Sequence, residues 1–163
     1  MEIRPETPTD ASAISSVIED AFASAEHSDG TEAAIVERLR QANALSTSLV
    51  ATDASAIVGH VALSPVTIDG ADIGWLGLGP VAVRPDRQGN GIGRALVNSA
   101  LDRARSMGAA GCVVLGEPAY YERFGFRAIP RLRYPGPPAE YFQALAFRGE
   151  APSGTVAYHP AFG

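Results

Sequence analysis

The chain contains no lysine. All 13 of its basic residues are arginine, and with 18 acidic residues the formal net charge is −5. Proteins that bind nucleic-acid backbones depend on clustered positive charge, so this composition argues against a nucleic-acid partner. The single cysteine, Cys112, excludes an internal disulfide and falls in an apolar stretch, which predicts a small buried side chain.

Long apolar runs are also missing. No segment approaches the roughly 20 apolar residues that cross a membrane. The first six residues show neither the basic cluster nor the apolar run of a secretory signal. We therefore expect a cytoplasmic protein with no membrane partner. A length of 163 residues with 46% hydrophobic content predicts one domain over residues 1–163.

The most informative stretch that is present covers residues 81–96. An apolar strand there passes through Gly89, Gly91 and Gly93 into an amphipathic helix. Glycines let the backbone approach a ligand closely, and the start of a helix presents free N–H groups and the positive end of its dipole. The stretch therefore predicts a site for a phosphate or pyrophosphate.

The spacing excludes two familiar phosphate-binding loops. A Walker A loop needs Lys-Ser/Thr after Gly93, where Arg94-Ala95 stands, and a dinucleotide fingerprint that starts at Gly89 needs glycine at position 94. The pattern that remains, Gln88-x-x-Gly91-x-Gly93 preceded by Val-x-Val-x-Pro, resembles the acetyl-CoA-binding motif of the GNAT superfamily of N-acetyltransferases.

A second motif supports the resemblance. After an apolar strand at 111–115, Tyr121 begins a Y-x-x-x-G-F segment that ends at Gly125 and Phe126, as in that superfamily. The similarity is firm from Leu76 to Phe126, and the chain looks like the predicted acetyltransferases of bacteria. The resemblance implies acetyl-CoA as cosubstrate, no metal, and, by analogy, a homodimer.

The resemblance also implies a mixed α/β fold. Its central sheet is mostly antiparallel and splayed between a pair of parallel strands, with helices on both faces. Hydrophobic periodicity predicts helices starting near Thr7–Asp10, over 31–41 and 92–107, and a short one from Pro118. Strands are expected at 1–4, 48–52, 57–68, 73–83, 111–115 and 141–147, with a last strand or an ordered extension in the tail.

Gly79-Pro80 interrupts the strand at 73–83. Proline cannot donate to a ladder and glycine is a weak strand former, which indicates a bulge. Such a bulge would leave the backbone of 81–83 unpaired, where the resemblance places the pantetheine arm of CoA. The alternative is an edge strand that tolerates proline.

Site residues follow from the resemblance, position by position. The cofactor-binding set is Val81, Ala82, Val83, Gln88, Gly89, Asn90, Gly91, Ile92, Gly93 and Arg94. Four arginines surround the second motif, and we expect either solvated surface or contact with the CoA phosphates for them; they are Arg123, Arg127, Arg131 and Arg133.

Tyr121 matches the tyrosine that many superfamily members use as general acid toward the CoA sulfur. Its ordinary pKa near 10 lies close to that of a thiol. The alternative is that Tyr121 only packs against pantetheine, and Tyr120 is expected to be structural. Glu117 is the best-placed base, with capping of the next helix as its alternative role. The other candidates are His60, for which a structural role is favoured, and Glu26, His27 and Glu32.

The expected function is transfer of an acetyl group from acetyl-CoA to a primary amine of a small molecule or peptide, directly within a ternary complex. The alternative is a non-catalytic acyl-CoA-binding or regulatory module with the same fold. A toxin that acetylates aminoacyl-tRNA shares the motif, but the acidic, lysine-free composition argues against it.

Overall fold

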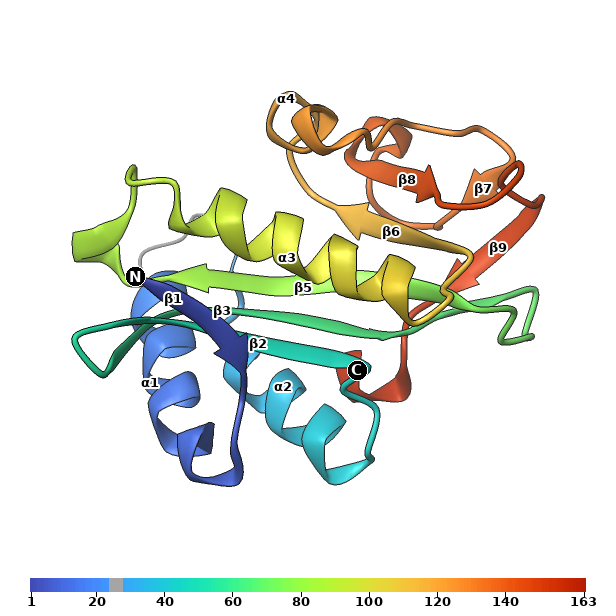
Figure 1. The fold of residues 1–163 in the computed structure, drawn as a ribbon. Helices are drawn as coiled ribbons and strands as arrows, with labels where there is room; N and C mark the ends of the chain where they lie inside the picture. Colours follow the sequence, from blue (N-terminus) through green and yellow to red (C-terminus); the bar gives the residue numbers. More distant parts are fainter. Residues whose placement is uncertain (24–27) are drawn as a thin grey trace.

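The computed structural model describes residues 1–23 and 28–163. Its centre is a six-stranded sheet in the order β1-β2-β3-β5-β6-β8 (Figure 1). Neighbouring strands are antiparallel except β5 and β6, which pair in parallel, and this confirms the predicted mixed sheet. The strands are β1 (Glu2–Pro5), β2 (Thr47–Asp53), β3 (Ala56–Pro65), β5 (Trp75–Val83), β6 (Gly111–Leu115) and β8 (Phe142–Ala146).

Helices cover both faces of this sheet. The helix α3 (Ile92–Ser106) packs on one face, and α1 (Ala11–Phe22) with α2 (Glu32–Gln41) packs on the other (Figure 1). The apolar face predicted for α3 is buried as far as Ala104, but Met107 caps the helix end and is 53% exposed. Within the described residues, no helix has both the length and the apolar character needed to cross a membrane.

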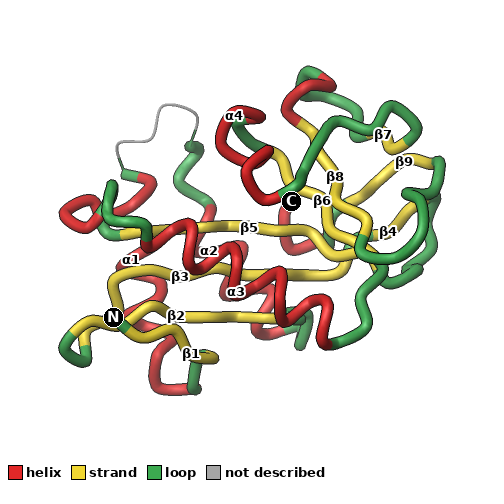
Figure 2. Tube along the Cα trace, turned by 45° about the horizontal axis from the view of Figure 1, so that its top comes forward, coloured by secondary structure: helices red, strands yellow, loops and turns green. Residues whose placement is uncertain are grey.

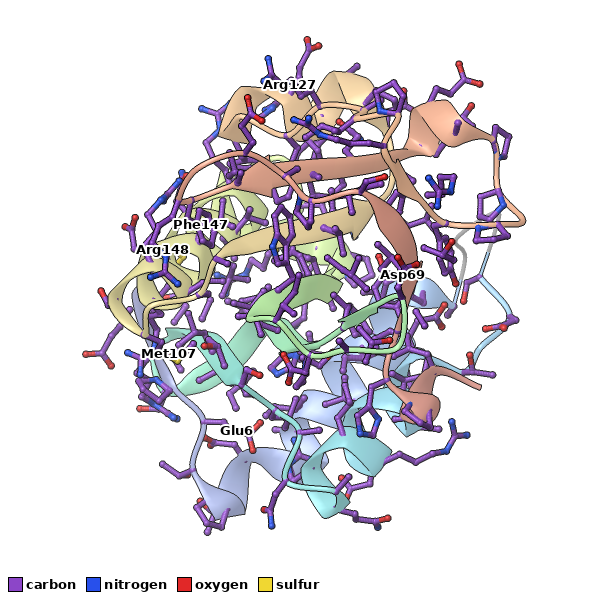
Figure 3. The ribbon with its side chains drawn as sticks, turned by 90° about the vertical axis from the view of Figure 1, so that its right-hand side faces the viewer. Glu6, Asp69, Met107, Arg127, Phe147 and Arg148 are labelled. Carbon is purple, nitrogen blue, oxygen red and sulfur yellow. The ribbon has the colours of Figure 1, made fainter. Side chains whose placement is uncertain are left out.

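A second, three-stranded sheet lies beside β6 and β8 (Figure 2). It contains β4 (Thr67–Ile68), β9 (Gly154–Ala157) and β7 (Leu132–Arg133). The predicted strand at 57–68 is therefore two strands in different sheets, and the tail does form a strand. Asp69, labelled in Figure 3, holds β9 in place: its N–H donates to the Thr155 carbonyl, and its carboxylate accepts from the Thr155 N–H, each at 2.9 Å.

The bulge in β5 is present where the sequence predicts it. Val61 of β3 pairs with Val81, whereas Leu63 pairs with Leu78, so β5 contains one extra residue over this step. Beyond the bulge β5 also departs from β6, because their parallel pairing ends at Leu78 and Val114. We call the space past these two residues the strand gap.

The short helix after β6 is more tightly wound than predicted. It consists of α4 (Pro118–Tyr121) followed by a 3-10 turn over Glu122–Phe124. Gly125 then stops it with a φ of 97°, in the left-handed region that favours glycine.

A polar cluster ties α2 to the sheet on the side away from α3. Glu6, labelled in Figure 3, accepts hydrogen bonds from Arg40 of α2, at 2.9 and 3.0 Å, and from the Ser48 hydroxyl. His60 is fully buried and contacts the same hydroxyl through Nε2 at 2.8 Å. The Ser48 hydroxyl uses its one proton on Glu6, so in the contact between Ser48 and His60 the ring N–H of His60 is the donor. Burial lowers the pKa of His60 to about 4.

Lowering the pH from 6.5 toward 4 is expected to destabilise the fold through His60. Its pKa is about 4 when folded and 6.5 when unfolded, so over this window the unfolded chain binds the proton more readily. At about 1.4 kcal/mol for each pKa unit, the loss in unfolding free energy reaches about 3 kcal/mol. Urea unfolding at a series of pH values measures it.

Two histidine variants isolate this effect. His60→Gln should flatten the dependence of unfolding free energy on pH between 4 and 6.5. His159→Gln changes a histidine that caps the last helical turn outside this cluster, and should keep the wild-type dependence. An unaltered pH dependence in His60→Gln would contradict the role assigned to the buried ring.

Candidate active site

The loop from β5 to α3 exposes its backbone at its glycines. Gly89 and Gly91 have φ values of 83° and 82°, which only glycine adopts without strain, and a Cβ at either position would meet nothing within 4 Å. Gly91 is the N-cap residue of α3, and within the described chain no side chain caps that helix or places an acid in its first turn. The first N–H groups of α3 are therefore free for an anion.

A cavity of about 510 Å³ lies at this end of α3, and we call it the α3 cavity. Its lining residues are Val83, Arg87, Gln88, Gly89, Gly91, Ile92, Gly93, Arg94, Tyr120 and Arg123. None of the described residues that line it is acidic. Arg87 pairs with Asp53, whereas Arg94 and Arg123 form no ion pair within the described chain. A protein of net charge −5 thus holds a locally positive cavity.

The ten predicted cofactor-binding residues do not all lie in one place. Seven of the ten line the α3 cavity: Val83, Gln88, Gly89, Gly91, Ile92, Gly93 and Arg94. Asn90 braces the loop instead, since its side-chain amide donates to the Arg87 carbonyl at 3.2 Å. Val81 lies at the strand gap. Ala82 is buried among the residues of α1, with its side chain on the opposite face from α3.

The backbone of β5 past the bulge alternates between β3 and the strand gap. The Arg84 N–H donates to the Val58 carbonyl of β3 at 2.8 Å. Peptide groups alternate in direction along an antiparallel pair, so Ala82 also faces β3, and Val81 and Val83 face the gap. The Gln88 side chain reaches the Val83 carbonyl from that side, at 3.1 Å. An extended ligand with amide groups can pair with these two residues as an added strand.

Tyr121 and Tyr120 point in different directions from α4. A Cβ on Gly116 would lie 2.5 Å from the Tyr121 ring, which also packs edge-on against Phe126 at 6.0 Å between centroids. Burial raises the pKa of Tyr121 to about 12, so its hydroxyl keeps its proton and is a donor at neutral pH.

Tyr120, for which the sequence predicted a structural role, lines the α3 cavity. Its hydroxyl lies 3.3 Å from the place a Cβ on Gly93 would occupy, inside the α3 cavity. The available signal was helical geometry: adjacent residues of a helix are about 100° apart, so if Tyr121 faces the core, Tyr120 faces elsewhere.

The four arginines around the second motif do not act together. The Arg123 guanidinium lies over the Tyr120 ring, 4.6 Å from its centroid, and lines the α3 cavity. Arg127 lies at the outer surface near β8 (Figure 3), and Arg131 pairs with Glu150 at 3.8 Å. Arg133 lines a separate cavity formed by residues 128–142.

The candidate bases are scattered. Glu117 is the N-cap residue of α4, one residue past Gly116, and its exposed side chain makes no capping hydrogen bond within the described chain. Glu32 accepts from the Ser28 hydroxyl at 2.8 Å, and His60 is held by Ser48 in the buried cluster. Glu26 and His27 lie outside the described residues. No group of three metal-ligating side chains occurs in the described part of the chain.

Comparison with known proteins gives consistent results. A family model for the acetyltransferase (GNAT) domain matches residues 44–128. The uncharacterized N-acetyltransferase YhbS of Escherichia coli K12 is 38% identical over 170 residues, which cover 99% of this chain and 98% of YhbS.

Two solved structures share the fold over nearly the whole chain. A GNAT family acetyltransferase from Brucella melitensis, in complex with acetyl-CoA, has a TM-score of 0.91 at 49% identity, over 99% of this chain and 97% of that one. YhbS from Escherichia coli, in complex with CoA, also has a TM-score of 0.91, at 36% identity, over 99% of this chain and 91% of that one. The chain matches these relatives in sequence and in fold over nearly its full length. It belongs to the GNAT family of acetyltransferases.

Proposed function

We propose that this protein transfers the acetyl group of acetyl-CoA directly to a primary amine of a small molecule or peptide, within a ternary complex. The position of Val83 is the main support for this proposal. Val83 lines the α3 cavity, and its backbone N–H and carbonyl face the strand gap. A phosphate site and an amide-pairing site therefore adjoin, in the order in which CoA carries its pyrophosphate and its pantetheine arm.

The donors present fit that ligand. The free N–H groups of Ile92 and Gly93 and the guanidinium of Arg94 suit the pyrophosphate, since a helix start attracts anions. The peptide groups of Val81 and Val83 suit the pantetheine amides. The complexes of the Brucella melitensis relative with acetyl-CoA and of YhbS with CoA support the same assignment.

Tyr121 is proposed to assist the leaving sulfur. Bound acetyl-CoA would supply an acetyl thioester, and transfer forms a C–N bond and breaks the C–S bond. The pKa of Tyr121 is about 12, whereas that of a thiol is roughly 8.5. Tyr121 therefore holds its proton more tightly than a general acid toward the CoA sulfur should. Its hydroxyl would therefore stabilise the developing thiolate by a hydrogen bond, while the proton that the amine loses becomes the one that the thiol gains.

Glu117 is proposed as the base that removes this proton. It follows the carboxyl end of β6, where the strand gap opens, and its carboxylate is exposed and uncommitted within the described chain. Holding amine and thioester together supplies most of the remaining rate.

Replacing Gly93 with valine is expected to block nucleotide binding. A side chain there would meet the Tyr120 hydroxyl at 3.3 Å and a Val83 methyl at 3.7 Å, and so fill the α3 cavity. CoA affinity in calorimetric titration should fall by about 30-fold or more, the equivalent of about 2 kcal/mol. Asn98→Val is the control, because it adds the same side chain at an exposed position of α3. Equal CoA affinity in Gly93→Val and wild type would rule out this cavity.

Replacing Tyr121 with phenylalanine is expected to lower turnover by about 100-fold, the usual cost of losing one donor to a developing anion. Thiol release from acetyl-CoA, measured with polyamines, aminoglycosides and peptide amines, gives the rate. Affinity for acetyl-CoA should stay within about threefold, because only the hydroxyl is lost. Tyr134→Phe, in the separate cavity of residues 128–142, is the matched control.

The results separate the two functions under consideration. Unchanged turnover in Tyr121→Phe would show that the hydroxyl has no part in the reaction. Wild-type protein that binds acetyl-CoA but releases no thiol with any amine would favour the non-catalytic module.

A further inference from the structure

The α3 cavity holds more positive charge than a pyrophosphate needs. The start of α3, with its free N–H groups and Arg94, already provides an anion site on one wall. Arg123 lines the same cavity from the turn after α4, and it has no carboxylate partner within the described chain. A second anionic group on the same ligand would account for this second cation.

CoA carries such a group. Besides the two charges of its pyrophosphate, it has a phosphate monoester on the ribose 3′ oxygen, which contributes about two more at neutral pH. We propose that Arg123 binds this 3′-phosphate and makes the protein selective for CoA over dephospho-CoA. The inference rests on the proposed function, because it assumes that CoA occupies the α3 cavity.

The ring of Tyr120 positions the Arg123 guanidinium for this contact. The guanidinium lies 4.6 Å from the ring centroid, and the ring itself packs edge-on against Tyr121 at 5.0 Å and Phe124 at 5.5 Å. A guanidinium stacked on a fixed ring loses little freedom when it binds, and its planar fork matches a phosphate. Tyr120 is thus a positioning residue for Arg123, and its own hydroxyl lies close to the first turn of α3.

The test combines two ligands with two forms of the protein. Calorimetric titration gives the dissociation constants of CoA and dephospho-CoA for wild type and for Arg123→Gln. Wild type should bind CoA about tenfold more tightly, as expected for one charge-assisted contact. In Arg123→Gln this ratio should fall to about one, while the affinity for dephospho-CoA stays within about twofold and so shows that the fold is intact.

Further variants test whether the effect is specific to Arg123 and whether it needs the Tyr120 ring. Arg127→Gln removes an exposed arginine outside the cavity and should keep the wild-type ratio. Tyr120→Phe, which keeps the ring, should also retain it, whereas Tyr120→Leu should reduce it. Higher salt should reduce the wild-type ratio, because the contact is exposed and ionic.

Three results would overturn the proposal. The first is a wild type that binds the two nucleotides equally, and the second is an Arg123→Gln protein that keeps the wild-type ratio. In the third, wild type binds neither nucleotide, and then the proposed nucleotide site itself is wrong. Binding of dephospho-CoA therefore distinguishes the failure of this inference from the failure of the function on which it rests.

Discussion

The site depends on one irregularity in one strand. Gly79 and Pro80 add a residue to β5, so that its pairing with β3 shifts by one position between Leu78 and Val81. The same stretch ends the parallel pairing with β6. A regular strand here would bury these peptide groups in the sheet; the bulge instead turns Val81 and Val83 toward open space, where their hydrogen-bonding capacity is available to a ligand.

The electrostatics of the site are local and oppose the charge of the whole molecule. The net charge of −5 repels an anionic cosubstrate at long range, so attraction has to come from groups at contact distance. The uncapped start of α3 supplies it through backbone N–H groups, and Arg94 and Arg123 supply it through side chains. Arginine suits this role because it stays charged and presents a planar set of donors to phosphate.

The parts of the structure that local sequence determines were predictable. Gly79-Pro80 indicated a bulge because proline cannot donate to a ladder, and Gly89 and Gly91 mark left-handed backbone that other residues avoid. The helix α3 and the parallel pair around it follow from periodicity and connection rules. These features are also the ones on which the family resemblance rests.

The parts that depend on packing were not predictable. Which of the two adjacent tyrosines enters the α3 cavity is decided by how α4 sits on β6 and α3, and the rise in the pKa of Tyr121 needs the burial that this packing creates. The interruption between β3 and β4 arises because Thr67 and Ile68 pair with β9, nearly 90 residues later in the chain. A local pattern carries no information on such a pairing.

Amide hydrogen exchange at three consecutive residues of β5 tests the account most directly. NMR would follow the N–H groups of Val81, Ala82 and Val83 with and without CoA. If the pantetheine arm pairs with β5 across the strand gap, exchange at Val81 and Val83 should slow by about tenfold or more when CoA binds. Ala82, already turned toward β3, should change less and serves as the internal reference. Saturating CoA that leaves Val81 and Val83 exchanging as fast as before would contradict the central claim.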